Sequence, residues 1–159
     1  MIIIITLLIS FVFSAFLEVA LLCIIFIPLR EYAGGFHAKN RAVCQVISSI
    51  FILVGILGIK ILVNHINLLV YGLGEFICAI IIILCAPVDT INHKISDSER
   101  KYFKNVTRGI LVVEITMGIV FIQMANIPAA ILIAHSSAAS SLLIEKIYQK
   151  RLEIKKQLK

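Results

Sequence analysis

Residues 66–87 have the sequence INLLVYGLGEFICAIIIILCAP, in which Glu75 is the one charged side chain. A transmembrane helix needs about 20 consecutive, mainly apolar residues to cross the roughly 30 Å hydrocarbon core of a bilayer. This segment meets that requirement. It therefore predicts a helix that crosses a membrane, and it places the chain in the helical membrane class.

The chain carries further apolar runs on both sides of this segment, at residues 1–29, 43–63, 107–124 and 128–147. The first run would be about 43 Å long as one helix, which exceeds the bilayer core. We therefore expect either one tilted or bent span there, or a short interfacial piece followed by a span. The five runs predict an all-α, polytopic integral membrane bundle of about five transmembrane helices (four to six), in one membrane-embedded domain covering 1–159.

The composition agrees with this class. Hydrophobic residues make up 60% of the 159 positions, or about 95 side chains, and the mean hydropathy is +1.04. Only 15% of the residues are charged, against about 25% in a soluble domain. The polar surface is too small for a soluble enzyme, a disordered chain or a nucleic-acid-binding domain, despite the net charge of +6.

The basic residues fall in alternate connections between the runs. Residues 30–42, 88–108 and 145–159 hold 14 of the 15 Lys and Arg residues, whereas residues 64–65 and 125–127 hold none. Cytoplasmic loops of membrane proteins carry such an excess of Lys and Arg. We therefore expect these three segments and the C-terminus to be cytoplasmic, in contact with anionic lipid and not with nucleic acid.

Residues 30–44, REYAGGFHAKNRAVC, form the connection best suited to chemistry, a cytoplasmic catalytic loop and helix start. Gly34 and Gly35 allow backbone conformations that other residues avoid. His37 can carry protons near neutral pH. Cys44 lies among cations where a helix is expected to begin, and both features favour a reactive thiolate.

A hydrated histidine and a buried cysteine would also fit this loop. On one continuous helix, His37 and Cys44 would lie about 10.5 Å apart along the axis, whereas a base must approach within about 2.6–3.2 Å. A working pair thus requires a turn between them, or a histidine from another subunit. The other three cysteines, Cys23, Cys78 and Cys85, lie in apolar runs, where cysteine packs as a small hydrophobe.

The segment REYAGGFHA, followed by Cys44 seven residues after His37, resembles the accessory gene regulator protein B family, membrane cysteine endopeptidases of Gram-positive quorum sensing. Residues 86–94, APVDTINHK, are also similar to that family, and the resemblance extends over about 22–108. It implies that His37 and Cys44 are the catalytic pair. It also implies that Arg30, Gly34 and Gly35 shape the site.

The resemblance further implies a substrate and a location. The substrate would be a small amphipathic propeptide with an acidic C-terminal part, which is cut through a Cys acyl-thioester and cyclised into an autoinducing peptide; a thiolactone, a lactone or a linear product remains compatible. The location would be the bacterial cell membrane, with a cytoplasmic active site. Backbone N–H groups or Gln45 could stabilise the oxyanion, and Glu31 or Asn40 could orient His37. The histidine spacings match no metal-ligand motif, and we expect no cofactor.

A second basic segment follows residue 88. Ser96–Glu99 predicts a capping box that starts a short helix. Its basic residues could anchor the loop to lipid headgroups. Alternatively, Lys94, Arg100 and Lys101 could bind the acidic part of a propeptide.

Ionisable residues inside membrane spans usually have a function. The set here is Glu18, Glu75, Glu114 and His135. They could be hydrogen-bonded structural groups facing other helices, or Glu75 could bind the substrate. The alternative function for the whole chain is a small membrane transporter or exporter component that uses these glutamates.

Small residues dominate one part of the last run. Ala134 with Ala138, and Ser137 with Ser141, follow the small-xxx-small pattern of closely packed membrane helices. This pattern predicts helix packing or a homodimer interface, with His135 as a hydrogen-bonded member.

Overall fold

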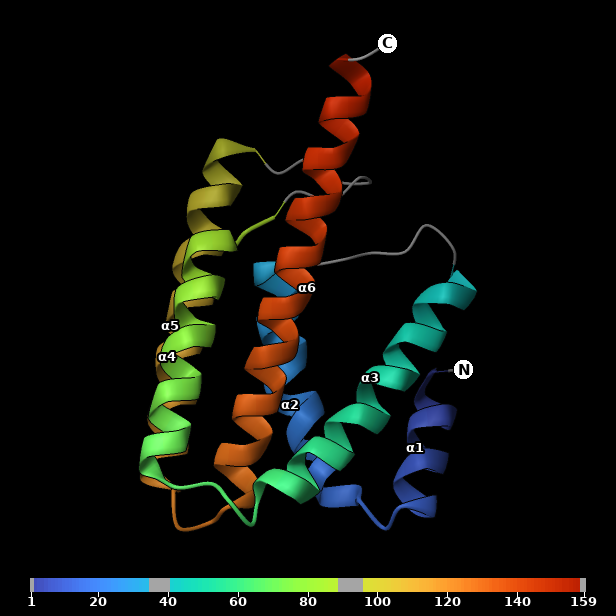
Figure 1. The fold of residues 1–159 in the computed structure, drawn as a ribbon, viewed down its shortest axis with the longest axis vertical. Coiled ribbons are helices and arrows are strands. Elements are labelled where there is room, and N and C mark those ends of the chain that lie inside the picture. Colours follow the sequence, from blue (N-terminus) through green and yellow to red (C-terminus); the bar gives the residue numbers. More distant parts are fainter. Residues whose placement is uncertain (1, 35–40, 89–95, 158–159) are drawn as a thin grey trace.

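The computed structural model describes residues 2–34, 41–88 and 96–157, and Figure 1 shows their arrangement as a helical bundle. The helices are α1 (Ile2–Val12), α2 (Phe16–Ala33), α3 (Arg41–Leu62), α4 (Leu68–Cys85), α5 (Asp97–Val120) and α6 (Asn126–Gln157). No β-strand occurs in these residues, so the predicted all-α class is confirmed for the described part of the chain.

The first apolar run forms two helices. Between α1 and α2, Ser14 has a φ of 48°, a left-handed conformation that is uncommon for residues other than glycine. Ala15 is fully buried beside it, and its N–H donates to the carbonyl of Ser10 at 2.9 Å. Of the two arrangements expected for residues 1–29, a short helix followed by a longer one is therefore correct. The interfacial position of α1 stays a prediction.

Helix α6 lies in the middle of the bundle and packs against α2, α3, α4 and α5 (Figure 1). Alanine is the most frequent residue on its buried face, at Ala129, Ala130, Ala134, Ala138 and Ala139. Small side chains let membrane helices approach closely. The Ala134 and Ala138 pair thus packs inside one chain, while a homodimer interface on this helix stays a prediction.

Two helices extend beyond the predicted apolar runs. Helix α5 begins at Asp97 because Ser96 and Glu99 form the predicted capping box, with the Ser96 N–H donating to Oε2 of Glu99 at 2.9 Å. The predicted short length of the helix that starts at this capping box is wrong, because its basic residues are the first turns of α5, which continues to Val120. Helix α6 likewise continues ten residues past the predicted end at residue 147.

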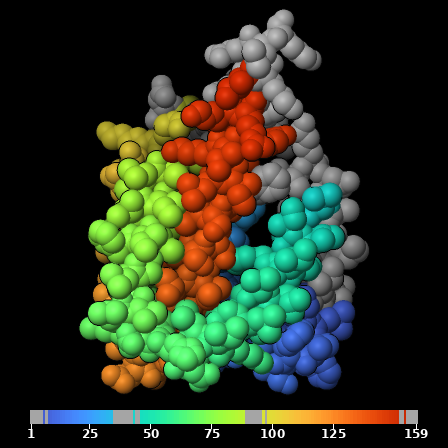
Figure 2. Space-filling view, in the orientation of Figure 1, coloured from blue at the N-terminus to red at the C-terminus, as the bar shows by residue number. Residues whose placement is uncertain are grey.

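Two described stretches are long and apolar enough to cross a membrane, Leu68–Cys85 and Asn126–Arg151, and Val46–Leu62 is apolar but shorter. The topology of about five spans therefore stays a prediction. The outside of the bundle is apolar as well. Leu69 and Leu84 of α4 are 70% and 71% exposed, and α4, α6 and α3 cover the face seen in Figure 2. Such an extensive exposed apolar surface is typical of contact with lipid.

The two ends of the bundle differ in charge. Helices α2 and α4 end, and α3 and α5 begin, at the upper end in Figure 1, where the last turns of α6 also lie. The basic residues of these turns include Arg30, Arg41, Arg100, Lys101, Lys104, Lys146, Lys150 and Arg151. We call this the basic end. The α3–α4 and α5–α6 connections lie at the opposite end and contain no Lys or Arg.

Candidate active site

The site is built around the end of α2, where the chain turns toward the segment containing His37. Gly34 caps α2 with a φ of 79°, and its N–H donates to the carbonyl of Arg30 at 3.1 Å. The N–H of Val88 donates to the carbonyl of Ala33 at 3.3 Å. The described parts of the two stretches that resemble the peptidase family, 30–34 and 86–88, therefore meet at the basic end.

Gly34 is required there for two separate reasons. A positive φ is a conformation that side-chain-bearing residues adopt only at a cost. In addition, a Cβ atom at this position would lie 2.9 Å from the carbonyl oxygen of Val88, which is backbone and cannot swing away. The glycine thus permits the close approach of α2 to the chain after α4.

Gly34→Ala is expected to lower the free energy of unfolding by about 1–3 kcal/mol, the cost of holding a residue in a sparsely populated conformation. Thermal unfolding of the purified chain in detergent measures the loss. Gly72→Ala is the matched control, because a Cβ at Gly72 in α4 meets no atom within 4 Å and alanine favours a helix. Equal stability of the two variants would contradict this role for Gly34.

Aromatic side chains hold the end of α2 in place from two directions. Tyr32 packs edge-on against Tyr102 and Phe103 of α5, with ring centroids 6.4 Å and 6.0 Å away. One turn and a half earlier, Phe26 stacks on Phe51 of α3 at 4.4 Å. The end of α2 is thus held between α5 and α3.

Arg30, predicted to shape the site, lies against one of these aromatic side chains, Phe26. Its guanidinium carbon is 5.6 Å from the centroid of the Phe26 ring, a cation–π distance. Its backbone carbonyl receives the Gly34 hydrogen bond. Arg30 and Gly34 could be singled out from the sequence. Phe26, Tyr102 and Phe103 could not, because their contacts depend on which helices are neighbours.

Cys44 lies in the first turn of α3, which begins at Arg41. The first four N–H groups of a helix have no partner within it and carry a partial positive charge. Gly35, His37 and Asn40 lie outside the described residues, so the turn required between His37 and Cys44 stays a prediction. Gln45 follows in the next position of α3.

The basic residues expected to bind substrate are at the same end. Arg100 and Lys101 belong to the first turn and a half of α5, and Lys101 is exposed. The contact of Tyr32 with the next two residues of α5 brings this basic turn beside the end of α2. Lys94 lies outside the described residues. Glu31, one of the groups considered for orienting His37, is exposed on α2.

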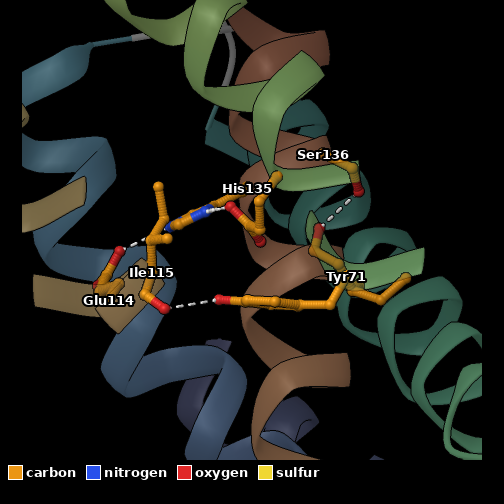
Figure 3. Close-up of polar contacts among 7 residues, drawn as sticks. Tyr71, Glu114, Ile115, His135 and Ser136 are labelled. Atoms are coloured by element: carbon orange, nitrogen blue, oxygen red, sulfur yellow. Dashed lines mark hydrogen bonds and ion pairs between the residues drawn. The ribbon is translucent and has the colours of Figure 1, made fainter. Parts of the chain in front are cut away.

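Glu75, also predicted to bind substrate, does not lie at the basic end but inside the bundle. It is 2% exposed inside the bundle, where its Oε2 lies 2.6 Å from Nδ1 of His135. The other ring nitrogen of His135, Nε2, lies 2.8 Å from Oε2 of Glu114 (Figure 3). Three of the four intramembrane groups named from the sequence therefore form one cluster, while Glu18 lies apart from them on α2.

The cluster Glu75–His135–Glu114 lies away from the segment of residues 30–44. Glu75 is the eighth residue of α4, about 10 Å from the helix start at a rise of 1.5 Å per residue. That start lies at the end opposite the basic end (Figure 1). Within the described ranges, no group of three His, Cys, Asp or Glu side chains is arranged to hold a metal ion.

The fold indicates the class of protein to which the chain belongs. The described residues form helices without strands, two of these helices are long and apolar enough to cross a membrane, and the outer surface is apolar, a combination typical of helical membrane proteins. Residues 1–145 match the family model AgrB, described as Accessory gene regulator B, and the chain belongs to this family. The resemblance found over residues 22–108 is thus confirmed and extends further. No curated protein and no solved structure matches the chain.

Family membership links the chain to quorum sensing. It connects this membrane-associated protein with maturation of the accessory gene regulator peptide, a peptidase-like role.

Proposed function

We propose that this protein is a membrane cysteine endopeptidase that cuts a small propeptide through Cys44, with His37 as the general base. Family membership over residues 1–145 supports the proposal. The observation that supports it most is the close approach of Gly34 to Val88, because it places the end of α2 at the same end of the bundle as the first turn of α3, to which Cys44 belongs.

The first step forms an acyl-enzyme. His37 accepts the proton of the Cys44 thiol, and the thiolate attacks the carbonyl carbon of the scissile peptide bond. The C–N bond then breaks, and the leaving nitrogen takes the proton from His37. The N-terminal part of the propeptide remains on Cys44 as a thioester, and the C-terminal fragment departs with a free amine.

The second step closes the ring. His37 accepts the proton of a thiol earlier in the bound peptide, and the resulting thiolate attacks the carbonyl carbon of the thioester. The C–S bond to Cys44 then breaks, and Cys44 leaves as a thiolate. Exchange of one thioester for another is nearly isoenergetic, so the activation of the acyl group is kept in a thiolactone. Water competes for the same carbonyl, and a site at the membrane surface would limit hydrolysis by excluding it.

The remaining groups would hold the substrate and stabilise the oxyanion. The unpaired N–H groups of the first turn of α3 are suited to a developing negative charge, and Gln45 could add a side-chain donor. Arg100 and Lys101, with Lys94, would attract the acidic part of the propeptide. By the charge distribution, the basic end would face the cytoplasm and contact anionic lipid. A homodimer is compatible with this arrangement.

A chain whose only thiol is Cys44 is expected to keep its cleavage activity. Cys78 is buried, and Cys23 and Cys85 are half-buried in the helices, so replacing these three with alanine removes small apolar side chains and no proposed catalytic group. Cleavage of a synthetic propeptide by this variant in lipid vesicles, compared with the unmodified chain, measures the effect. Loss of cleavage in a folded triple variant would contradict the assignment.

The same variant separates the two candidate functions. Treatment with an alkylating reagent should abolish cleavage in the single-cysteine chain, and prior incubation with propeptide should protect it. The alternative function, a transporter or exporter component that uses Glu75 or Glu114, would be insensitive to alkylation of Cys44 and sensitive to replacement of the glutamates.

A further inference from the structure

The cluster Glu75–His135–Glu114 is a polar site that the proposed peptidase chemistry does not use. It joins three different helices, because Glu75 belongs to α4, His135 to α6 and Glu114 to α5. His135 is fully buried, and both its ring nitrogens are within hydrogen-bond distance of a carboxylate oxygen, at 2.6 Å and 2.8 Å. Figure 3 shows His135 beside Glu114, with a dashed line that marks their contact.

The two hydrogen bonds fix a minimum number of protons. Each N···O contact needs one proton between its two atoms, whichever atom holds it. Without any of these protons, two carboxylates and an imidazolate would carry a charge of minus three. Two protons reduce the charge to minus one, and only a third proton makes the cluster neutral. An unneutralised charge inside a bilayer is costly.

The third proton has one clear place to bind. Oε1 of Glu75 is buried and has no hydrogen-bond partner among the described residues. The nearby Tyr71 hydroxyl is not available to it, because it donates to the backbone carbonyl of Ile115 at 3.3 Å (Figure 3). The Glu114 side chain is more exposed than that of Glu75, 11% against 3%, so it is better placed to carry a negative charge.

We propose that Glu75, His135 and Glu114 form an intramembrane proton-binding site that holds three protons, the third of them on Oε1 of Glu75. In this state an imidazolium donates to the Glu114 carboxylate and to Oε2 of a neutral Glu75 carboxyl, and the cluster has no net charge. Release of the third proton to water leaves one negative charge between α4, α5 and α6. Occupancy of the site therefore sets how stably these three helices pack together.

Two other titratable groups interact electrostatically with the cluster, Tyr71 and Cys78, both on α4. Neither provides a positive charge. Tyr71 is fully buried, and its ring occupies the space that a side chain at Gly118 of α5 would need. The site thus has no neighbouring cation among the described titratable groups that could replace the third proton.

Infrared spectroscopy of the full chain in lipid nanodiscs, in H₂O and in D₂O, tests the proposal without reference to peptidase activity. The unmodified chain should show a protonated carboxyl band that shifts in D₂O. Glu75→Gln should lose one carboxyl equivalent of this band, because imidazolium and the Glu114 carboxylate then neutralise each other. Glu114→Gln should lose it as well, because the imidazolium and the Glu75 carboxylate then neutralise each other and no third proton is needed.

Glu31→Gln, at an exposed position of α2, is the matched control and should leave the band unchanged. The proposal is wrong if the unmodified chain has no protonated carboxyl band, a result that needs no variant to fold. It is also wrong if Glu75→Gln leaves the band intensity unchanged, which would assign the signal to another glutamate. A band that appears only when sodium is withdrawn would show that a cation, not a proton, occupies Glu75.

Discussion

Replacement of Cys44 with alanine is expected to lower the rate of propeptide cleavage by at least about 10⁴-fold, the scale of loss when a nucleophile is removed from a covalent catalytic pair. In the proposed mechanism the Cys44 thiolate forms the acyl-enzyme. Its removal therefore leaves the reaction without its nucleophile. His37→Ala should have a comparable effect, because the two residues act as one unit. Cleavage is measured on a synthetic propeptide with the purified chain in lipid vesicles.

Cys85→Ala is the control for this experiment. Cys85 ends α4 and is half-buried near the basic end, so its replacement tests for nonspecific damage to the same region. It should retain cleavage close to that of the unmodified chain. If Cys44→Ala is folded in the membrane and still cleaves the propeptide, the cysteine-endopeptidase proposal is wrong.

His135→Ala should produce the largest loss of stability among single substitutions in the bundle. It removes both hydrogen bonds of the cluster and leaves Glu75 and Glu114 without their shared partner. Hydrogen bonds between membrane helices average only about 0.6 kcal/mol, but removing one partner of a buried charged network costs about 3–5 kcal/mol. We expect a value near the lower end of that range, because the carboxyls can take up protons.

Reversible unfolding in mixed detergent micelles measures this loss. His65→Ala is the matched control, since His65 is exposed in the connection between α3 and α4 and surface substitutions usually change stability by less than about 0.5 kcal/mol. Similar stabilities for the two histidine variants would contradict the claim that His135 stabilises the bundle by joining Glu75 and Glu114.

The fold class could be predicted from the sequence because apolar length and charge position act locally along the chain. The run 66–87 predicts a span by itself, and the capping box at Ser96 fixes where α5 starts. The break near Ser14 could not be predicted, because it depends on the burial of Ala15 against other helices. The extension of α6 to Gln157 could not be predicted from the apolar run, because that run ends at residue 147 while the helix continues with mainly polar residues.

The site could be predicted only in part, for a similar reason. Motif spacing singled out Gly34, and the structure supplies its physical requirement, the carbonyl of Val88. The pairing of Glu75 with Glu114 through His135 requires knowing that α4, α5 and α6 are neighbours, which no local pattern contains. The same is true of the packing of Tyr32 against α5.

Trapping the acyl-enzyme tests the central claim most directly. A propeptide whose internal thiol is replaced by alanine can be cleaved but cannot close a ring, so the thioester should accumulate. Acid quenching and mass spectrometry should then find the N-terminal propeptide fragment attached to Cys44 and released by hydroxylamine. Cleavage of that peptide with Cys44 unmodified throughout, or with the fragment on another residue, would contradict the account.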